Sequence, residues 1–172
     1  MKLLYDKLSI QKKILRMGKD ISKKYKGKNP IFIGILNGGF IFLADLLRSL
    51  EINCEVDFIK VKSYEGMKST GKIELVQDVS IKLNNRHVIL VEDIIDSGNT
   101  IKFLIKKFNK ISLKSLSVAT FLIKPDVNKF EFLIDYIGFE VGQDFVVGYG
   151  LDYNQRFRNL DGLYILDKKN DF

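Results

Sequence analysis

Residues 88–100, VILVEDIIDSGNT, place acidic side chains directly before a turn that contains glycine. The polar residues of this stretch are Glu92, Asp93, Asp96, Ser97, Gly98, Asn99 and Thr100. A strand that ends in such a turn before a helix binds phosphate well, because free backbone N–H groups and the positive end of the helix converge there. Carboxylates at the same place repel phosphate. The stretch therefore indicates a ligand with an anionic end and a hydroxyl-bearing end.

A sugar phosphate has both of these ends. We predict that its phosphate binds the backbone N–H groups of residues 96–100 and the hydroxyl groups of Ser97 and Thr100. Its ribose hydroxyls and a magnesium ion would meet Glu92 and Asp93, because hard cations prefer oxygen ligands.

A purely structural role explains only part of this pattern. The dipole of a helix favours an acid at the N-terminal end, so Asp96 alone could be a helix cap. Glu92 and Asp93 follow an apolar strand directly, and adjacent strand residues point to opposite faces, so at least one carboxylate should meet the crevice at the carboxyl edge of the sheet. Clustered carboxylates cost stability unless a cation or hydroxyl groups meet them. We therefore favour a binding function.

The elements that must position these residues alternate along the chain. Strands are expected at residues 31–36, 54–64, 72–80, 86–92, 116–123, 135–141, 145–150 and 163–166, and helices at residues 41–50 and 100–111. The second and third strands would form a long hairpin around a polar, flexible segment. Strands and helices in repetition predict an α/β fold with a parallel sheet at its core, in a single domain spanning residues 1–172.

Composition limits the class of protein further. The chain of 172 residues is 46% hydrophobic and 28% charged, as in a soluble globular domain. No apolar run reaches the roughly 18 residues that suggest a membrane span, and residues 1–20 do not read as a secretory signal. We therefore expect a cytoplasmic protein without a membrane partner.

Few residues of the chain indicate a metal or a nucleic acid as a ligand. Cys54 is the single cysteine and His87 the single histidine, which excludes an internal disulfide and a Cys/His zinc site, so a metal would be held by carboxylates. His87 reads as a residue at the start of a strand. The net charge of +7 comes mostly from scattered lysines, which favours a solvated surface. Attraction of phosphate-bearing ligands or of nucleic acid stays open as the alternative, although no arginine-rich run or zinc finger supports nucleic-acid recognition.

Two other glycine motifs are weak. Residues 66–73, GMKSTGKI, match the start of a nucleotide-triphosphate P-loop, but Ile73 stands where a serine or threonine should bind magnesium and a strand is expected where a helix should follow. Residues 148–153, GYGLDY, lack the third glycine and the helix of a dinucleotide-binding motif.

Residues 88–100 resemble the phosphoribosyl pyrophosphate (PRPP) signature of the type I phosphoribosyltransferases. Further motifs, GILNGGFIFLADLLR, VKSYEGMKSTGKIEL, FLIKPD and FVVGYGLDYNQRFRNL, are similar to those of the hypoxanthine-guanine phosphoribosyltransferases, and together they cover roughly residues 30–166. The resemblance implies an α/β fold with a central, mainly parallel sheet flanked by helices, a flexible hairpin lid and a small hood. It also implies Mg²⁺-dependent transfer of a phosphoribosyl group from PRPP to N9 of hypoxanthine or guanine.

The resemblance assigns the purine side of the site to five residues. Asp96 would face N7 of the base as the general base, and Lys124 would bond the 6-oxo group. Phe145 would stack on the purine, and the backbone of Val146 would bond its edge. Asp152, in the same part of the site, would bind a second magnesium ion.

The resemblance also assigns the ribose and pyrophosphate side. Glu92 and Asp93 would hold the ribose hydroxyls directly or through magnesium, and Arg158 would bind pyrophosphate. The remaining residues are Asn37, Gly38 and Gly39 at the pyrophosphate and Ser63 and Tyr64 in the lid. Some family members carry a basic residue at the position of Asn37, so weaker charge compensation is expected there.

Several alternatives stay open at this point. A regulator of the same fold that binds RNA would keep the PRPP signature, and within the enzymes a xanthine-preferring or a pyrimidine phosphoribosyltransferase is the closer competitor. The apolar residues Leu3, Leu4, Leu8, Ile14 and Leu15 could belong to the core or to an interface. The resemblance implies a homodimer or a homotetramer.

Overall fold

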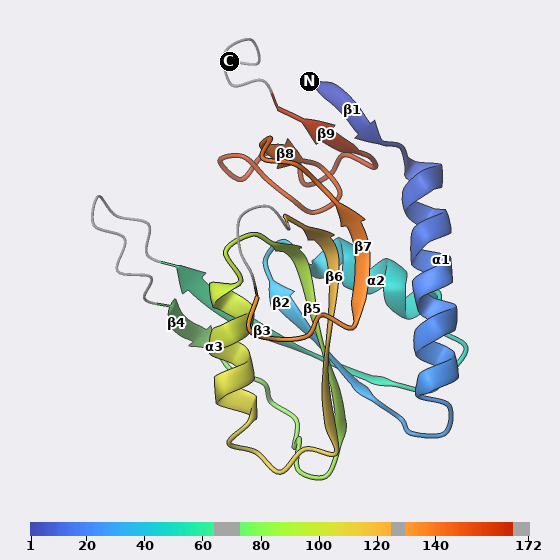
Figure 1. The fold of residues 1–172 in the computed structure, drawn as a ribbon, viewed down its shortest axis with the longest axis vertical. Helices are drawn as coiled ribbons and strands as arrows, with labels where there is room; N and C mark the ends of the chain where they lie inside the picture. Colours follow the sequence, from blue (N-terminus) through green and yellow to red (C-terminus); the bar gives the residue numbers. More distant parts are fainter. Residues whose placement is uncertain (64–72, 125–129, 167–172) are drawn as a thin grey trace.

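The computed structural model of the chain describes residues 1–63, 73–124 and 130–166 (Figure 1). Its elements are β1 (Lys2–Tyr5), α1 (Lys7–Lys24), β2 (Ile31–Leu36), α2 (Phe40–Arg48), β3 (Glu55–Ser63), β4 (Ile73–Gln77), β5 (His87–Ile95), α3 (Asn99–Phe108), β6 (Ser115–Ile123), β7 (Tyr136–Glu140), β8 (Val146–Val147) and β9 (Leu163–Ile165). No helix of the described ranges is both long and apolar enough to span a membrane.

A six-stranded sheet forms the centre of the molecule, in the order β4-β3-β2-β5-β6-β7. Its strands are parallel except for β4, which pairs antiparallel with β3. The predicted hairpin and the predicted mainly parallel sheet are thereby confirmed. Because Ile73 opens a strand, the strand expected after the P-loop-like residues is also confirmed.

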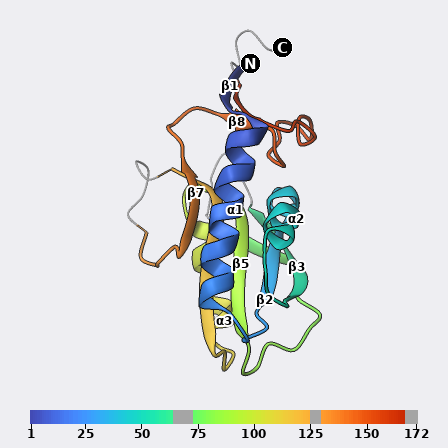
Figure 2. The ribbon, with the colours of Figure 1, turned by 90° about the vertical axis from the view of Figure 1, so that its right-hand side faces the viewer.

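Helices cover both faces of this sheet. The side chains of the central strand β5 alternate between two apolar clusters, one on each face. Ile89 and Val91 pack in the cluster that contains α1 and α2. Val88 and Leu90 pack in the cluster that contains α3. Figure 2 shows α1 and α2 side by side, on the side of the sheet that faces the viewer. Continuous apolar strands are typical of a sheet buried on both faces.

A second sheet of three short strands, in the order β1-β9-β8, forms a small hood. It lies beyond the end of the large sheet at which β5 and β6 finish (Figure 1). Strand β9 pairs antiparallel with β1 on one side and with β8 on the other. The hood therefore joins segments from both ends of the sequence.

Among the elements that the sequence led us to expect, the structure differs most at β5, α3 and β8. Strand β5 continues to Ile95, because Ile94 and Ile95 still pair with β6, so Glu92 and Asp93 lie within the strand rather than after it. Helix α3 has Gly98 rather than Asp96 as its N-cap. The strand expected over residues 145–150 is limited to β8, with two residues.

The N-terminal apolar residues divide between core and surface. Helix α1 and strand β1 were not among the expected elements. Ile14 is buried and Leu4 packs against the core, whereas Leu3, Leu8 and Leu15 are exposed. Helical spacing on α1 explains the difference between Ile14 and the exposed Leu8 and Leu15, because residues three or four apart share one face of a helix.

Candidate active site

The turn after β5 has the shape of an anion site. Gly98 adopts a φ of 72°, a left-handed conformation that glycine tolerates best, and helix α3 begins at the next residue. A hollow of about 100 Å³ is lined by Glu92, residues 94–100 and Ile101. The hydroxyl oxygen of Ser97 accepts a hydrogen bond from the Asn99 N–H at 3.4 Å. The predicted phosphate residues therefore lie together at the N-terminal end of α3.

The neighbouring carboxyl groups lie in an environment that disfavours their charge. Glu92 is 7% exposed and Asp93 is half-buried. Burial raises the pKa of Glu92 well above its ordinary value, and the charge of Asp93 raises it further. Burial also raises the pKa of Asp93, against the opposing effects of its hydrogen bonds and of the Arg158 charge. A cation bound beside the pair would relieve this strain.

The glycine turn after β2 lies directly against Asp93. A Cβ atom on Gly38 would be 1.5 Å from Asp93 Oδ2, so a larger residue there would force the Asp93 carboxylate to move. The Gly39 N–H donates to the Ile35 carbonyl at 3.2 Å, and the Leu36–Asn37 peptide bond is cis. The side chain of Asn37 is exposed. The predicted pyrophosphate turn is therefore in contact with Asp93, one of the two predicted ribose carboxylates.

Lys124 follows β6 and reaches Asp96 across the end of the sheet. Its residue exposure is 9%, and its Nζ lies 3.5 Å from Asp96 Oδ2. The Lys124 N–H donates to the Ile95 carbonyl at 3.1 Å, which fixes the lysine beside the end of β5. A cation and a carboxylate are thus presented next to each other at the mouth of the crevice.

Phe145 and Val146 form one wall of the hood. Phe145 is 38% exposed, and its ring meets that of Tyr153 edge-on, with the centroids 5.6 Å apart. The Phe145 carbonyl accepts from the Leu166 N–H at 2.8 Å, and Val146 pairs with Ile165. An exposed aromatic ring held on a paired strand is suited to stacking with a flat ligand. No local sequence pattern singled out Tyr153.

Asp152 and Arg158 are held in one loop. Arg158 Nη2 lies 2.7 Å from Asp152 Oδ1, and Arg158 Nη1 donates to the Gly150 carbonyl at 2.8 Å. The Gln155 N–H donates to Asp152 Oδ2 at 2.8 Å. Gly150 packs against the glycine turn, because a Cβ atom there would be 2.4 Å from the Gly38 carbonyl oxygen. The loop therefore adjoins the predicted pyrophosphate turn.

The donor atoms of the site suit magnesium better than softer metals. Glu92, Asp93 and Asp152 supply only oxygen, which is the ligand type that Mg²⁺ prefers. The described residues contain no group of three or more His, Cys, Asp or Glu side chains arranged to hold a metal. Magnesium commonly binds one or two carboxylates and takes its other ligands from water and substrate phosphates. Separate ions at the acid pair and at Asp152 fit this pattern.

The lid residues are only partly described. Ser63 is the last residue of β3 and pairs with Ile73 of β4. Tyr64 lies outside the described residues, as does most of the segment expected to form the lid.

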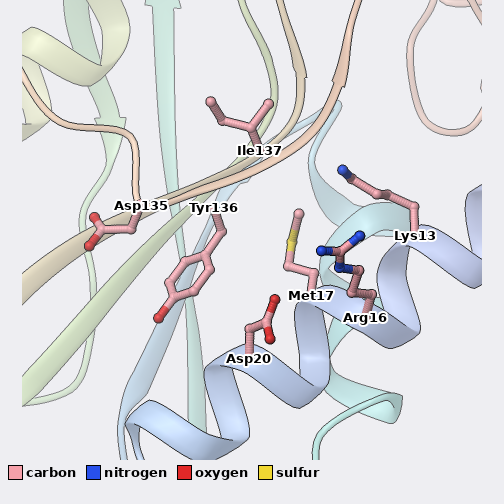
Figure 3. A pocket seen from close by; sticks show the side chains of 7 residues that line it. All are labelled: Lys13, Arg16, Met17, Asp20, Asp135, Tyr136 and Ile137. Carbon is pink, nitrogen blue, oxygen red and sulfur yellow. The ribbon is translucent and has the colours of Figure 1, made fainter.

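A polar hollow on the opposite part of the molecule is separate from this site. Figure 3 shows side chains of α1 facing the start of β7 across it. Its volume is about 280 Å³, and its lining residues are Lys13, Arg16, Met17, Asp20, Asp135, Tyr136 and Ile137. None of the predicted site residues lines it.

Comparison with known proteins identifies the class to which this fold and site belong. Residues 2–154 match the family model described as the phosphoribosyl transferase domain. The hypoxanthine-guanine phosphoribosyltransferase of Bacillus subtilis (strain 168) is 38% identical over 166 residues, which cover 96% of this chain and 92% of the relative. The chain belongs to the hypoxanthine-guanine phosphoribosyltransferase family, within the phosphoribosyltransferases.

Similarity also extends to a solved structure and to a larger protein. A crystal structure of a hypoxanthine phosphoribosyltransferase from Staphylococcus aureus has a TM-score of 0.93 and 32% identity, covering 98% of this chain and 92% of that one. The bifunctional protein TilS/HprT of Listeria monocytogenes serotype 4b (strain F2365) is 39% identical over 166 residues. The match covers 96% of this chain. It spans only 26% of the length of that relative.

Proposed function

We propose that the protein transfers the 5-phosphoribosyl group of PRPP to N9 of hypoxanthine or guanine, giving IMP or GMP and pyrophosphate. The observation that carries this proposal is the distance of 3.5 Å between Lys124 Nζ and Asp96 Oδ2, beside the anion-binding turn. In a 6-oxopurine the O6 and N7 atoms lie next to each other on one edge. The ammonium group of Lys124 would match O6, which accepts a hydrogen bond. The neighbouring carboxylate of Asp96 would match N7, which must lose its proton.

The proposed roles follow the polarity of the crevice. The 5-phosphate binds at residues 96–100, where backbone N–H groups and the end of α3 favour an anion. Glu92 and Asp93 meet the ribose hydroxyls, directly or through Mg²⁺. Phe145 stacks on the base, and the backbone of Val146 contacts its edge. This arrangement leaves the C1 atom of the ribose between the purine and the pyrophosphate.

The proposed reaction breaks the C1–oxygen bond to pyrophosphate and forms the C1–N9 bond to the purine. Asp96 accepts the proton that leaves N7, which requires a carboxylate within hydrogen-bond reach of that nitrogen. Arg158 and the turn of Asn37, Gly38 and Gly39 hold the departing pyrophosphate. Bound Mg²⁺, held by Glu92 and Asp93 and by Asp152, would supply positive charge to the leaving group, and charge stabilisation is usually the largest catalytic effect.

We also propose that the chain acts as a homo-oligomer in the cytoplasm. Exposed apolar side chains on α1 and at the start of α2, including Leu8, Leu15 and Phe40, support an interface between subunits. The free thiol of Cys54 is consistent with a reducing compartment. Light scattering coupled to size-exclusion chromatography would distinguish a dimer or tetramer from a monomer. A monomer would contradict the proposed homo-oligomer.

The test of the reaction is release of pyrophosphate from PRPP and Mg²⁺, with hypoxanthine, guanine, xanthine, adenine or uracil supplied separately. Release with 6-oxopurines, and not with adenine or uracil, is the expected result, and the relative rates rank the three 6-oxopurines. Release only with uracil would contradict the purine assignment. Failure with every base, by folded protein that still binds PRPP, would favour an RNA-binding regulator, which a salt-dependent RNA gel shift would detect.

A further inference from the structure

Tyr149 makes a partly buried contact that the reaction scheme does not use. Its side chain is 5% exposed, and its hydroxyl donates a hydrogen bond of 2.5 Å to Asp45 Oδ2 on helix α2. Its ring lies 4.7 Å from that of Phe121. Burial, followed by the hydrogen bond to Asp45 and the charge of Asp45, raises the pKa of Tyr149, so the hydroxyl remains a donor. The contact joins residues 104 positions apart in the sequence.

On one side of this contact, Tyr149 belongs to the loop that holds Arg158. The Tyr149 N–H donates to the Leu160 carbonyl at 2.9 Å, and the Gly150 N–H donates to the Arg158 carbonyl at 3.0 Å. The Arg158 guanidinium returns a hydrogen bond to the Gly150 carbonyl at 2.8 Å. Tyr149 has a φ of 49°, a conformation that a non-glycine residue keeps only when its surroundings hold it. Tyr149 and Arg158 are therefore fixed relative to each other.

On the other side, Asp45 belongs to the helix that continues the glycine turn. Helix α2 starts at Phe40, immediately after its N-cap Gly39, so Asp45 lies in the second turn of the helix. Helical hydrogen bonding makes the turn and Asp45 one rigid unit. The close approach of Gly150 to the Gly38 carbonyl is a second contact between this unit and the loop.

We propose that Tyr149 and Asp45 are positioning residues for pyrophosphate, holding the Arg158 loop at a fixed separation from the glycine turn of residues 37–39. This inference rests on the proposed function. Pyrophosphate is contacted from both units, so its binding depends on the separation between them. A steric contact alone prevents the loop from coming closer, whereas the hydrogen bond prevents it from moving away.

The purine contacts do not depend on this separation in the same way. Val146 is held by pairing with Ile165, and Phe145 by the hydrogen bond from Leu166. Lys124 is attached to the end of β6 and reaches Asp96 on β5's turn. Loss of the Tyr149 hydroxyl should therefore weaken ligands that contain pyrophosphate more than ligands that do not.

The test is Tyr149→Phe, which keeps the ring against Phe121 and removes only the hydroxyl. We expect KM for PRPP, and for pyrophosphate in the reverse reaction, to rise about tenfold, the effect of losing one hydrogen bond to a charged group. KM for hypoxanthine and the Kd of IMP should change less than about twofold, since neither ligand contains pyrophosphate. Circular dichroism and Tm establish that the variant is folded.

Changes at Asp45 provide the matched controls. Asp45→Asn keeps an oxygen that accepts from Tyr149 and should retain wild-type KM for PRPP within about threefold, whereas Asp45→Ala should match Tyr149→Phe. The double variant Tyr149→Phe/Asp45→Ala should be no worse than either single change, because both remove one interaction. Arg48 forms an exposed ion pair with Asp45 and does not contact the loop of Tyr149 through it. Arg48→Ala should therefore leave the KM values and the Kd of IMP unchanged.

Two outcomes would overturn the inference. One is a folded Tyr149→Phe protein with unchanged KM for PRPP and pyrophosphate. The other is an equal loss for pyrophosphate, hypoxanthine and IMP, which would indicate a general structural role. Failure of the proposed function is distinct, because the wild-type protein would then release no pyrophosphate with any purine.

Discussion

Under the proposed function, Asp96 and Lys124 would divide two tasks between neighbouring side chains. The carboxylate would remove a proton from the base, and the ammonium group would recognise an oxygen acceptor. Their separation of 3.5 Å allows one purine edge to meet both groups. Because the two tasks differ, substitutions at the two residues should affect different kinetic constants.

Asp96→Asn should lower kcat by roughly 100-fold, within the range found for general bases, because the amide cannot accept the N7 proton. PRPP affinity should change little, since in the proposed site backbone N–H groups would provide most of the phosphate contacts. Single-turnover kinetics with hypoxanthine and a separate PRPP titration would measure both quantities. An unchanged kcat would exclude Asp96 as the base.

Lys124→Ala should reduce the preference for 6-oxopurines over adenine. In the proposed site the ammonium group would donate to the 6-oxo oxygen and repel the 6-amino group of adenine, so its removal should penalise hypoxanthine and relieve adenine. Comparison of kcat/KM for the two bases should give a selectivity lower by about tenfold or more. Equal losses for both bases would assign the lysine to packing rather than selection.

Gly38→Ala should disrupt the crevice without a comparable effect on folding. The added Cβ would lie 1.5 Å from Asp93 Oδ2, so the carboxylate must move from its position. We expect kcat/KM for PRPP to fall by roughly 100-fold, as for small misplacements in active sites. Gly142→Ala is the matched control, because no atom lies within 4 Å of the Cβ position there. Similar kinetic losses in both variants would contradict this account.

At the scale of elements, Asp57 fixes the chain that follows β4 onto β3. Its carboxylate accepts hydrogen bonds from the N–H groups of Phe58 at 2.8 Å, Ser80 at 2.6 Å and Ile81 at 3.1 Å. Burial raises the pKa of Asp57, but these hydrogen bonds outweigh burial, and the pKa is lowered overall. The charged carboxylate therefore stabilises the folded state above the unfolded pKa of about 4.

Asp57→Asn should lower the free energy of unfolding at pH 7 by about 1 kcal/mol, because charged acceptors make stronger hydrogen bonds than neutral ones. The difference from wild type should shrink as the pH falls through the lowered folded pKa, where wild-type Asp57 also becomes neutral. Urea unfolding at several pH values measures this. Asp161→Asn, in an exposed pair with Lys7, is the control and should show little effect. A difference independent of pH would contradict the electrostatic explanation.

The pattern of apolar residues predicted the large sheet and two of its helices, because strands buried on both faces and amphipathic helices leave local signals. Local pattern did not predict the end of β5, since its last residues are held in the strand by partners in β6. Helix α1 went unpredicted although Ile10, Ile14, Met17 and Ile21 recur at helical spacing among many lysines. The contact between Tyr149 and Asp45 has no local signal, because only the folded chain brings those residues together.

At the scale of the whole molecule, the order of strands predicts where the structure opens first. Strand β5 lies between β2 and β6 and is covered by apolar clusters on both faces, whereas β4 is an edge strand. Amide hydrogen exchange should therefore be slowest for residues 88–91 and faster by at least about 100-fold in β4 and β8. Exchange in β4 as slow as that in β5 would contradict this order.

The three-stranded hood also determines when during biosynthesis the site is completed. Every strand of the large sheet is translated before β8, and β8 obtains its partner only when β9 has left the ribosome. A nascent chain can therefore assemble the carboxylates and the phosphate turn while the wall that carries Phe145 is still unpaired. Because the Arg158 loop also lies between β8 and β9, the growing polypeptide should acquire affinity for a sugar 5-phosphate before it acquires affinity for pyrophosphate or a purine base.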